Sequence, residues 1–167
     1  MNAGESAFWQ FSLRFYRRPE VPAVCLTLQD QHGVDVNLLF FILFLSISGR
    51  QLTADDVGRI DACIRAWRLR VVQPLRALRR DLKGGIAPVK TEAAEALRSA
   101  IKRDELQAER LQQETLEQEF PVASTGIPAA ARAAAAANIA AYRSMIGTLP
   151  EAAVGPLFTA LTDEFSI

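Results

Sequence analysis

The chain has 167 residues, of which half are hydrophobic, and its 19 basic and 19 acidic side chains give a formal net charge of zero. A chain of this length can bury a sizeable core without disulfides or metals, which excludes a disordered tail, a collagen-like protein and a disulfide scaffold. The balanced charge also disfavours a protein that coats nucleic acid or an anionic membrane.

Two helices are predicted at the N-terminal end. Ser6 is a suitable N-cap for a first helix that runs to about Arg18, where Pro19 ends it. Pro22 suits the first turn of a second helix, and Gly33 suits its left-handed C-terminal cap.

A third helix is predicted over residues 36–48, with Asp35 as its N-cap and Gly49 as its stop. This segment is strongly apolar on every side of the helix, and Asn37 interrupts it near its start. It is shorter than the roughly 20 residues that a membrane span needs, so we interpret it as the central core helix of a bundle. Contact with a membrane or lipid is the alternative.

The longest amphipathic block begins at Thr53, which forms a capping box with Asp56. Pro74 lies inside this block and predicts a kink or short break near Val71, because proline removes one helical hydrogen bond and clashes with the preceding turn. The predicted apolar seam of the block is Val57, Ile60, Ile64, Trp67, Val71, Leu75, Leu78 and Leu82.

Three further helices follow in the second half of the chain. Residues 91–119 favour a helix with a thin apolar stripe, an alanine-rich helix runs from Pro128 to about Met145, and a last helix follows Pro150. No segment alternates apolar and polar residues with hairpin turns, so strands are not expected. The predicted fold is all-α: one domain over residues 1–167, with six or seven helices around the central helix.

Charge is divided unevenly along the chain. Residues 1–90 hold 13 basic and 8 acidic side chains, whereas residues 91–167 hold 6 and 11, so the two parts carry +5 and −5. We therefore expect the acidic helix over residues 91–119 to lie near the basic block of the first half. Exposed pairs of this kind set the arrangement of helices more than their stability.

Two polar clusters are candidates for a site. The first is the turn that contains Gln29, Asp30, Asp35 and Asn37, where capping explains Asp35 but Asn37 indicates either a buried polar network or a ligand site. The second is a basic stripe that borders the apolar seam and contains Arg65, Arg68, Arg76, Arg79 and Lys83. This stripe is interpreted as a flank paired with the acidic half, an anion-binding or nucleic-acid surface, or a docking face for an acidic partner.

Other chemistry is largely absent from the sequence. Cys25 and Cys63 are expected to be reduced and buried, and His32 is the single histidine, so no zinc site or other cofactor is implied. Trp67 is interpreted as a core residue, with stacking beside Arg68 as the alternative. No glycine-rich phosphate loop, Gly-x-Ser-x-Gly elbow or secretory signal is present, and we expect a cytoplasmic protein.

The first half of the chain resembles the bacterial proteins grouped as domain of unknown function 2390. The resemblance covers residues 8–83 and depends on FWQFSLRFYRRPEVPAVCLTLQDQHGVDVNLLFF, on Trp67-Arg68 and on VVQPLRALRRDLK. It implies a small, cytoplasmic, all-helical protein and supplies no catalytic residues. Residues 8–83 are accordingly predicted to form the core of the domain, and residues 90–167 its outer helices.

Taken together, these features predict a non-catalytic binding or accessory protein whose partner is another protein or an anionic small molecule. One competing hypothesis is a small helical enzyme that acts on a phosphorylated or acyl substrate, with Asp30 or Asp35 as base or metal ligand and the arginines as an anion clamp. Another is an RNA- or ribosome-associated factor. Association into a homo-oligomer is left open. The predicted ligand-binding residues are Gln29, Asp30, Asp35, Asn37, Trp67, Arg68, Arg76, Arg79 and Arg80.

Overall fold

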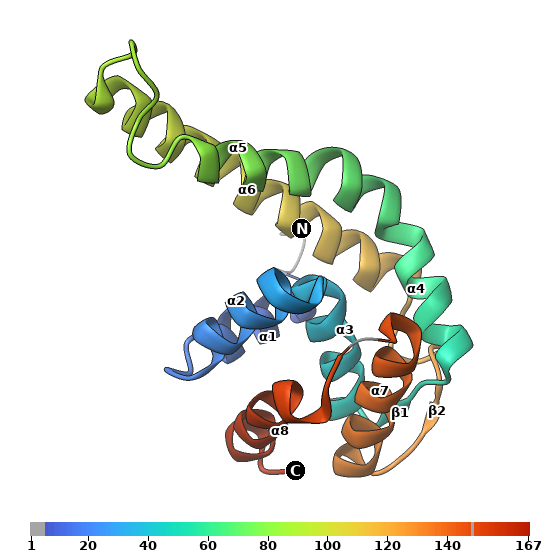
Figure 1. Ribbon diagram of the computed structural model, residues 1–167. Coiled ribbons are helices and arrows are strands. Elements are labelled where there is room, and N and C mark those ends of the chain that lie inside the picture. The colour runs from blue at the N-terminus through green and yellow to red at the C-terminus, as the bar shows by residue number, and fades with distance from the viewer. Residues whose placement is uncertain (1–5, 148) are drawn as a thin grey trace.

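The computed structural model describes residues 6–147 and 149–167, and the described chain is all-α apart from one pair of very short strands (Figure 1). Its helices are α1 (Ala7–Tyr16), α2 (Val21–His32), α3 (Val36–Ile47), α4 (Ala54–Trp67), α5 (Gln73–Asp81), α6 (Thr91–Glu119), α7 (Ala131–Ile146) and α8 (Glu151–Phe165). A π-helical segment, η1 (Arg68–Val72), joins α4 to α5 without a gap. Counting that kinked rod once, the described residues form seven helical rods, which agrees with the prediction.

The strands are a small correction to the sequence-based expectation. β1 (Arg50–Gln51) and β2 (Ile127–Pro128) pair in antiparallel register, with Arg50 opposite Pro128 and Gln51 opposite Ile127. Gly126 makes this close approach feasible, since a Cβ added there would lie 2.4 Å from the carbonyl oxygen of Gln51. Two-residue strands carry no alternating pattern, so the sequence gives no signal for them.

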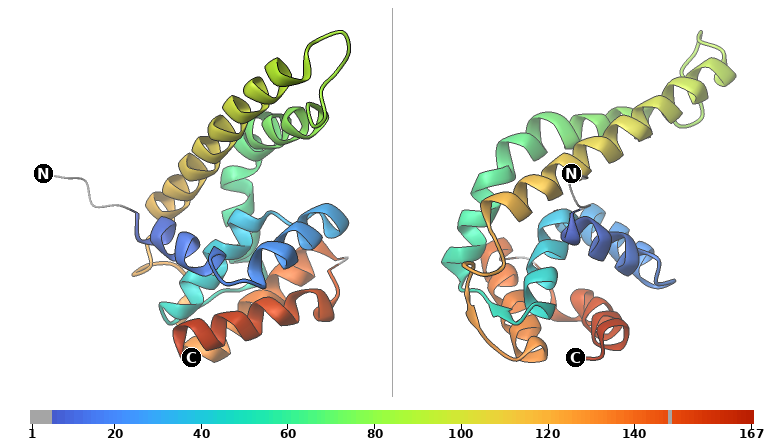
Figure 2. Two further views of the ribbon diagram at one scale, coloured as in Figure 1. Left: turned by 90° about the vertical axis from the view of Figure 1, so that its left-hand side faces the viewer. Right: turned by 180° about the vertical axis from the view of Figure 1, so that it is seen from behind.

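The helices form a body and an arm (Figures 1 and 2). Helices α1, α2, α3, α7 and α8 make the body, while α5 and α6 lie side by side and extend away from it as an antiparallel pair. The C-terminal half of α6 returns to the body and packs against α1, α3 and α4. The arm therefore meets the body along α6 and at the bend between α4 and α5.

The capping residues act as the sequence predicts. Ser6 accepts a hydrogen bond from the backbone of Trp9, and the Asp35 carboxylate accepts two at the start of α3. Gly33 ends α2 in the left-handed conformation with φ of 65°. Thr53 and Asp56 form the reciprocal capping box that opens α4.

Helix α3 is the central helix. Every side chain from Leu38 to Leu45 is buried, and the aromatic residues of α1 pack on it, with Phe8 and Phe41 rings 5.0 Å apart. No helix among the described residues is long and apolar enough to cross a membrane. The core also includes Tyr142 of α7 and Leu161 of α8, whereas the sequence predicts residues 90–167 as outer helices.

The predicted break near Val71 is the π-helical segment η1. A π-helical turn inserts one extra residue, and here it changes which valine faces the core. Val72 is buried, whereas Val71, the residue in the predicted seam, is partly exposed. Leu78 of the same seam is exposed, because the arm has only α6 beside it. Trp67, at the end of α4, is also exposed.

The cysteine prediction is half wrong. Cys25 of α2 is buried and reduced, and burial raises the pKa of its thiol to about 12. Cys63 is also reduced, but it lies on the exposed face of α4, outside the apolar seam.

Candidate functional site

An arginine on the π-helical segment connects the α2–α3 turn with α4. The Nη1 group of Arg68 donates to Asp35 Oδ2 at 3.0 Å and to Asp61 Oδ1 at 2.7 Å. The Arg68 side chain is 16% exposed, and those of Asp35 and Asp61 are 8% and 6% exposed. The polar turn near residue 33 and the kinked rod near residue 70 are therefore neighbours, joined by a nearly buried ion pair.

Further hydrogen bonds tie this junction to α6 and α7. Gln112 Nε2 donates to Asp35 Oδ2 at 2.9 Å, and Gln113 Nε2 donates to Asn37 Oδ1 at 2.7 Å. The Tyr142 hydroxyl of α7 accepts from the backbone N–H of Asp35 at 3.1 Å. We call the set of Asp35, Asp61, Arg68 and Gln112 the junction network.

The electrostatics of the junction network favour charged side chains in spite of their burial. Desolvation raises the pKa of Asp61, but hydrogen bonds from Arg68 and Arg65 outweigh it and bring that pKa below its usual value. Burial likewise lowers the pKa of Arg68, and the two carboxylates outweigh it and raise that pKa. Both groups are thus held in their charged forms.

A second group of opposite charges lies between α5 and α6, where the basic and acidic halves of the chain meet. Arg76 pairs with Glu105 and Glu109, and Arg79 pairs with Glu105. Hydrogen bonds from both arginines outweigh burial and lower the pKa of Glu105, whereas burial dominates at Glu109 and raises its pKa. Glu109 is therefore a weaker acid than Glu105.

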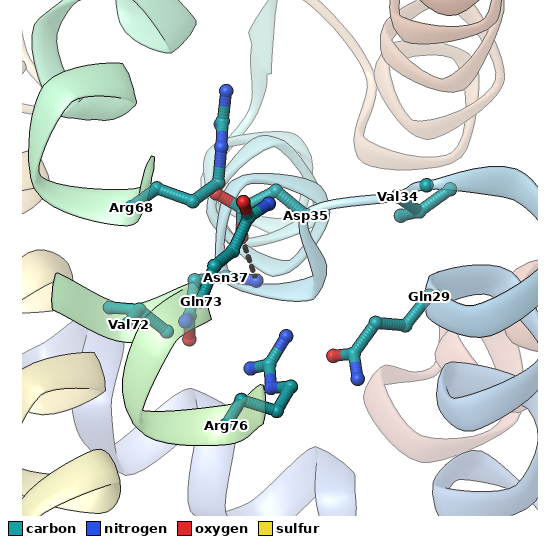
Figure 3. Close-up of a pocket in the computed structure, with 9 residues that line it drawn as sticks. Gln29, Val34, Asp35, Asn37, Arg68, Val72, Gln73 and Arg76 are labelled. Atoms are coloured by element: carbon teal, nitrogen blue, oxygen red, sulfur yellow. Dashed lines mark hydrogen bonds and ion pairs between the residues drawn. The ribbon is translucent and has the colours of Figure 1, made fainter. Parts of the chain in front are cut away.

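A small polar cavity, which we call the niche, lies between these two charged groups (Figure 3). It has a volume of about 60 Å³, enough for a few water molecules or one carboxylate-sized group. Figure 3 shows the Gln29 side chain and the Arg76 guanidinium directed into it from α2 and α5. Its lining is Gln29, Gly33, Val34, Asp35, Asn37, Arg68, Val72, Gln73 and Arg76.

The niche adjoins a larger cleft, which we call the groove, between α1, α2 and α6 with α3 as its floor. The groove has a volume of about 400 Å³, and Gln29, Asn37 and Arg76 line both cavities. Its apolar lining is Trp9, Leu13, Tyr16, Cys25, Leu26, Val36, Phe40 and Leu106. Its remaining polar lining is Ser12, Arg79, Lys102, Glu105, Glu109 and Gln113.

The structure brings together six of the nine predicted site residues. Five line the niche, and Arg79 lines the groove beside it. Asp30 and Arg80 instead form an ion pair at 2.5 Å with both side chains nearly half exposed. Trp67 faces α6, where its indole N–H donates to the carbonyl oxygen of Ala108 at 3.0 Å.

Several lining residues were missed by the sequence reasoning. Ser12, Lys102, Glu109 and Gln113 all line the groove. Lys102 forms no ion pair with any residue in the described part of the chain, whereas Glu109 pairs with Arg76. A signal was available on α6: Glu105, Glu109 and Gln113 recur every four residues, a spacing that places them on one helix face. The sequence interpretation instead followed the apolar stripe of this helix, in which Leu111 is exposed.

Comparison with known proteins places this site in a family. The family model for Protein of unknown function DUF2390 matches residues 7–116, well over half of the chain. The chain belongs to the DUF2390 family. No curated protein and no solved structure matches it. The DUF2390 match extends beyond the residues 8–83 of the sequence resemblance, and every residue that lines the niche or the groove lies within it.

Proposed function

We propose that the protein is a non-catalytic binding protein that takes the carboxylate of a small organic anion where the niche meets the groove. The observation that carries this proposal is the position of Arg76, which lines both cavities. Its Nε donates to Glu105 and its Nη2 to Glu109, while its Nη1 contacts no acceptor among the residues that the structure describes. A guanidinium has five N–H donors, so Arg76 retains donors for an incoming carboxylate.

The charge of the lining supports an anion. The groove places three cations, Arg76, Arg79 and Lys102, against two carboxylates, Glu105 and Glu109. Because Arg76 and Arg79 pair with the two carboxylates, the surplus charge is that of Lys102, an exposed residue that attracts an anion toward the groove. Side-chain amides of Gln29 and Asn37 beside Arg76 can supply further hydrogen bonds.

The hydrogen bonds that Asp35 accepts favour a binding role for this site over a catalytic one. Its Oδ1 accepts from the backbone N–H groups of Asn37 and Leu38, and its Oδ2 accepts from Arg68 and Gln112. A general base needs a lone pair directed at substrate, and these four hydrogen bonds occupy both oxygens. Asp30, the other candidate base, pairs with Arg80 at the surface, outside both cavities. Among the described residues, no three His, Cys, Asp or Glu side chains cluster as a metal site.

The arginines also favour this reading over RNA association. The five predicted stripe residues include Arg65, Arg68, Arg76 and Arg79, and each of these pairs with a carboxylate of this chain. A phosphate backbone needs several such contacts along the rod and would have to compete with those partners at each one, whereas the proposed carboxylate needs only the remaining donors of Arg76. Nucleic-acid surfaces instead present arginines without such partners.

The test is titration of the full chain with benzoate, followed by calorimetry and by amide NMR shifts. We expect saturable binding that Arg76→Gln weakens by about tenfold or more, as for loss of one charge-assisted hydrogen bond. Arg65→Gln is the matched control, because Arg65 is 57% exposed and lines neither cavity. Gln29→Ala is a second variant that leaves the ion pairs of Arg76 intact. Absence of carboxylate binding, or equal binding by Arg76→Gln and the unchanged chain, would contradict the proposal.

A further inference from the structure

The groove carries information about the rest of the ligand, beyond its carboxylate. Four of its apolar side chains, Leu13, Tyr16, Leu26 and Leu106, remain between 37% and 53% exposed. They come from three different helices and face one cleft, so they form a continuous apolar surface rather than isolated exposures. Contiguous apolar surfaces rimmed by polar residues mark binding sites.

Two buried polar atoms in the lining lack hydrogen-bond partners. Ser12 Oγ and Gln113 Oε1 have none among the described residues, although Ser12 is 5% and Gln113 4% exposed. A buried polar group without a partner costs on the order of 1–3 kcal/mol, so such groups are uncommon unless something completes the site. Both residues line the groove, Ser12 from α1 and Gln113 from α6, so a molecule bound in the groove would lie beside both side chains.

The size of the groove limits the occupant. A volume of about 400 Å³ lies in the range of small-molecule sites. An engineered cavity of about 150 Å³ accommodates one benzene ring, so the groove holds an apolar body of roughly two rings.

We infer that the ligand is an amphipathic organic acid: a carboxylate at Arg76 joined to an apolar body of roughly two rings, with a hydroxyl or amide that reaches Ser12 and Gln113. This inference rests on the proposed function and adds the chemical class of the ligand. The carboxylate sits at the niche, the apolar body lies against Phe40 and Leu106, and Lys102 provides the surplus positive charge near the outer end.

The experiment compares acetate, benzoate, 2-naphthoate and 6-hydroxy-2-naphthoate, whose hydroxyl lies on the ring away from the carboxylate, by calorimetry with the full chain. Each added ring buries apolar surface, so we expect 2-naphthoate to bind at least about tenfold more tightly than acetate. The hydroxyl should add about a further threefold or more. Equal, Arg76-dependent binding of acetate and 2-naphthoate would overturn the inference and leave the proposed function standing. Absence of binding by every acid would remove both.

Three variants locate the apolar body and the second polar group. Leu106→Glu should abolish the preference for 2-naphthoate over acetate, whereas Leu111→Glu, at an exposed position of the same helix outside the groove, should preserve it. Ser12→Ala should remove the advantage of the hydroxyl acid without lowering the urea midpoint, since it deletes an unpartnered group. Unchanged preferences in Leu106→Glu would overturn the inference. Self-association in sedimentation that Leu106→Glu abolishes would assign the groove to a second copy of the chain and would also overturn it.

Discussion

Replacement of Arg68 by methionine tests whether the junction network holds the arm to the body. Methionine keeps much of the side-chain volume but leaves Asp35 and Asp61, which are 8% and 6% exposed, without their shared guanidinium. Removal of one partner from a buried ion pair typically costs about 3–5 kcal/mol. Arg65 retains two hydrogen bonds to Asp61, and Asp35 retains those from Gln112 and from two backbone N–H groups, so we expect the lower end of this range, about 3 kcal/mol.

The assay is urea unfolding followed by far-ultraviolet circular dichroism, with Arg59→Met as the control. Arg59 pairs with Asp56 on the same helix, but its side chain is 73% exposed, so its loss should cost at most about 1 kcal/mol. A loss of unfolding free energy in Arg68→Met no larger than that in Arg59→Met would contradict a stabilising role for the junction network. It would show that the two carboxylates find water or other donors once the guanidinium is gone.

The pH dependence of the same variant provides an independent check. The pKa of Asp61 in the folded chain lies below the ordinary value of 3.8, so ionised Asp61 contributes to the free energy of unfolding above pH 3.8. This contribution is lost as the pH falls through the folded pKa. The stability gap between the unchanged chain and Arg68→Met should therefore narrow as the pH falls below 3.8. A gap that widens on acidification would contradict the assigned role of Arg68.

Three further predictions concern other parts of the structure, each measured by urea unfolding. Asn138→Ala removes the amide that bridges α3, β1 and Leu52, and should cost about 2–4 kcal/mol; a cost below about 1 kcal/mol would contradict the network. Gly126→Ala should destabilise the chain strongly, because the new Cβ would clash with the backbone of Gln51. Gly58→Ala should instead stabilise the chain by about 0.5–1 kcal/mol, because Gly58 has open space around it and alanine favours a helix more than glycine does. Because burial raises the pKa of Glu109, its ionisation opposes folding, so Glu109→Gln should gain stability relative to the unchanged chain as the pH rises from 4.5 to neutrality.

Much of the fold could be predicted because its local signals agree. Ser6, Gly33, Asp35 and Thr53 act as the expected caps, and the apolar run after Asp35 has the composition of a surrounded helix. These features depend on neighbours a few residues away, which a sequence displays directly. The burial of α7 in the core was harder to predict, since small alanine side chains permit close packing in a core as readily as they form an outer helix.

The site was predictable only in part, because the π-helical segment changes which side chains share a helix face and because some lining residues are far apart in the sequence. The extra residue of η1 rotates everything after it, so an ideal helical spacing misplaces the residues of α5 relative to those of α4. Trp67 precedes this insertion, and its side chain lies on the face of α4 that meets α6, where its indole N–H donates to Ala108 instead of joining Arg68 at the niche. Ser12 and Gln113 are far apart in sequence and carry no motif, so their meeting in one groove depends on the packing of α1 against α6.

The most direct measurement of the central claim is a crystal structure of the full chain soaked with the tightest-binding acid of the naphthoate series. We expect continuous density in the groove, with the carboxylate within hydrogen-bond distance of Arg76 and the rings against Phe40 and Leu106. Density for the acid at any other surface, with the groove empty, would contradict it.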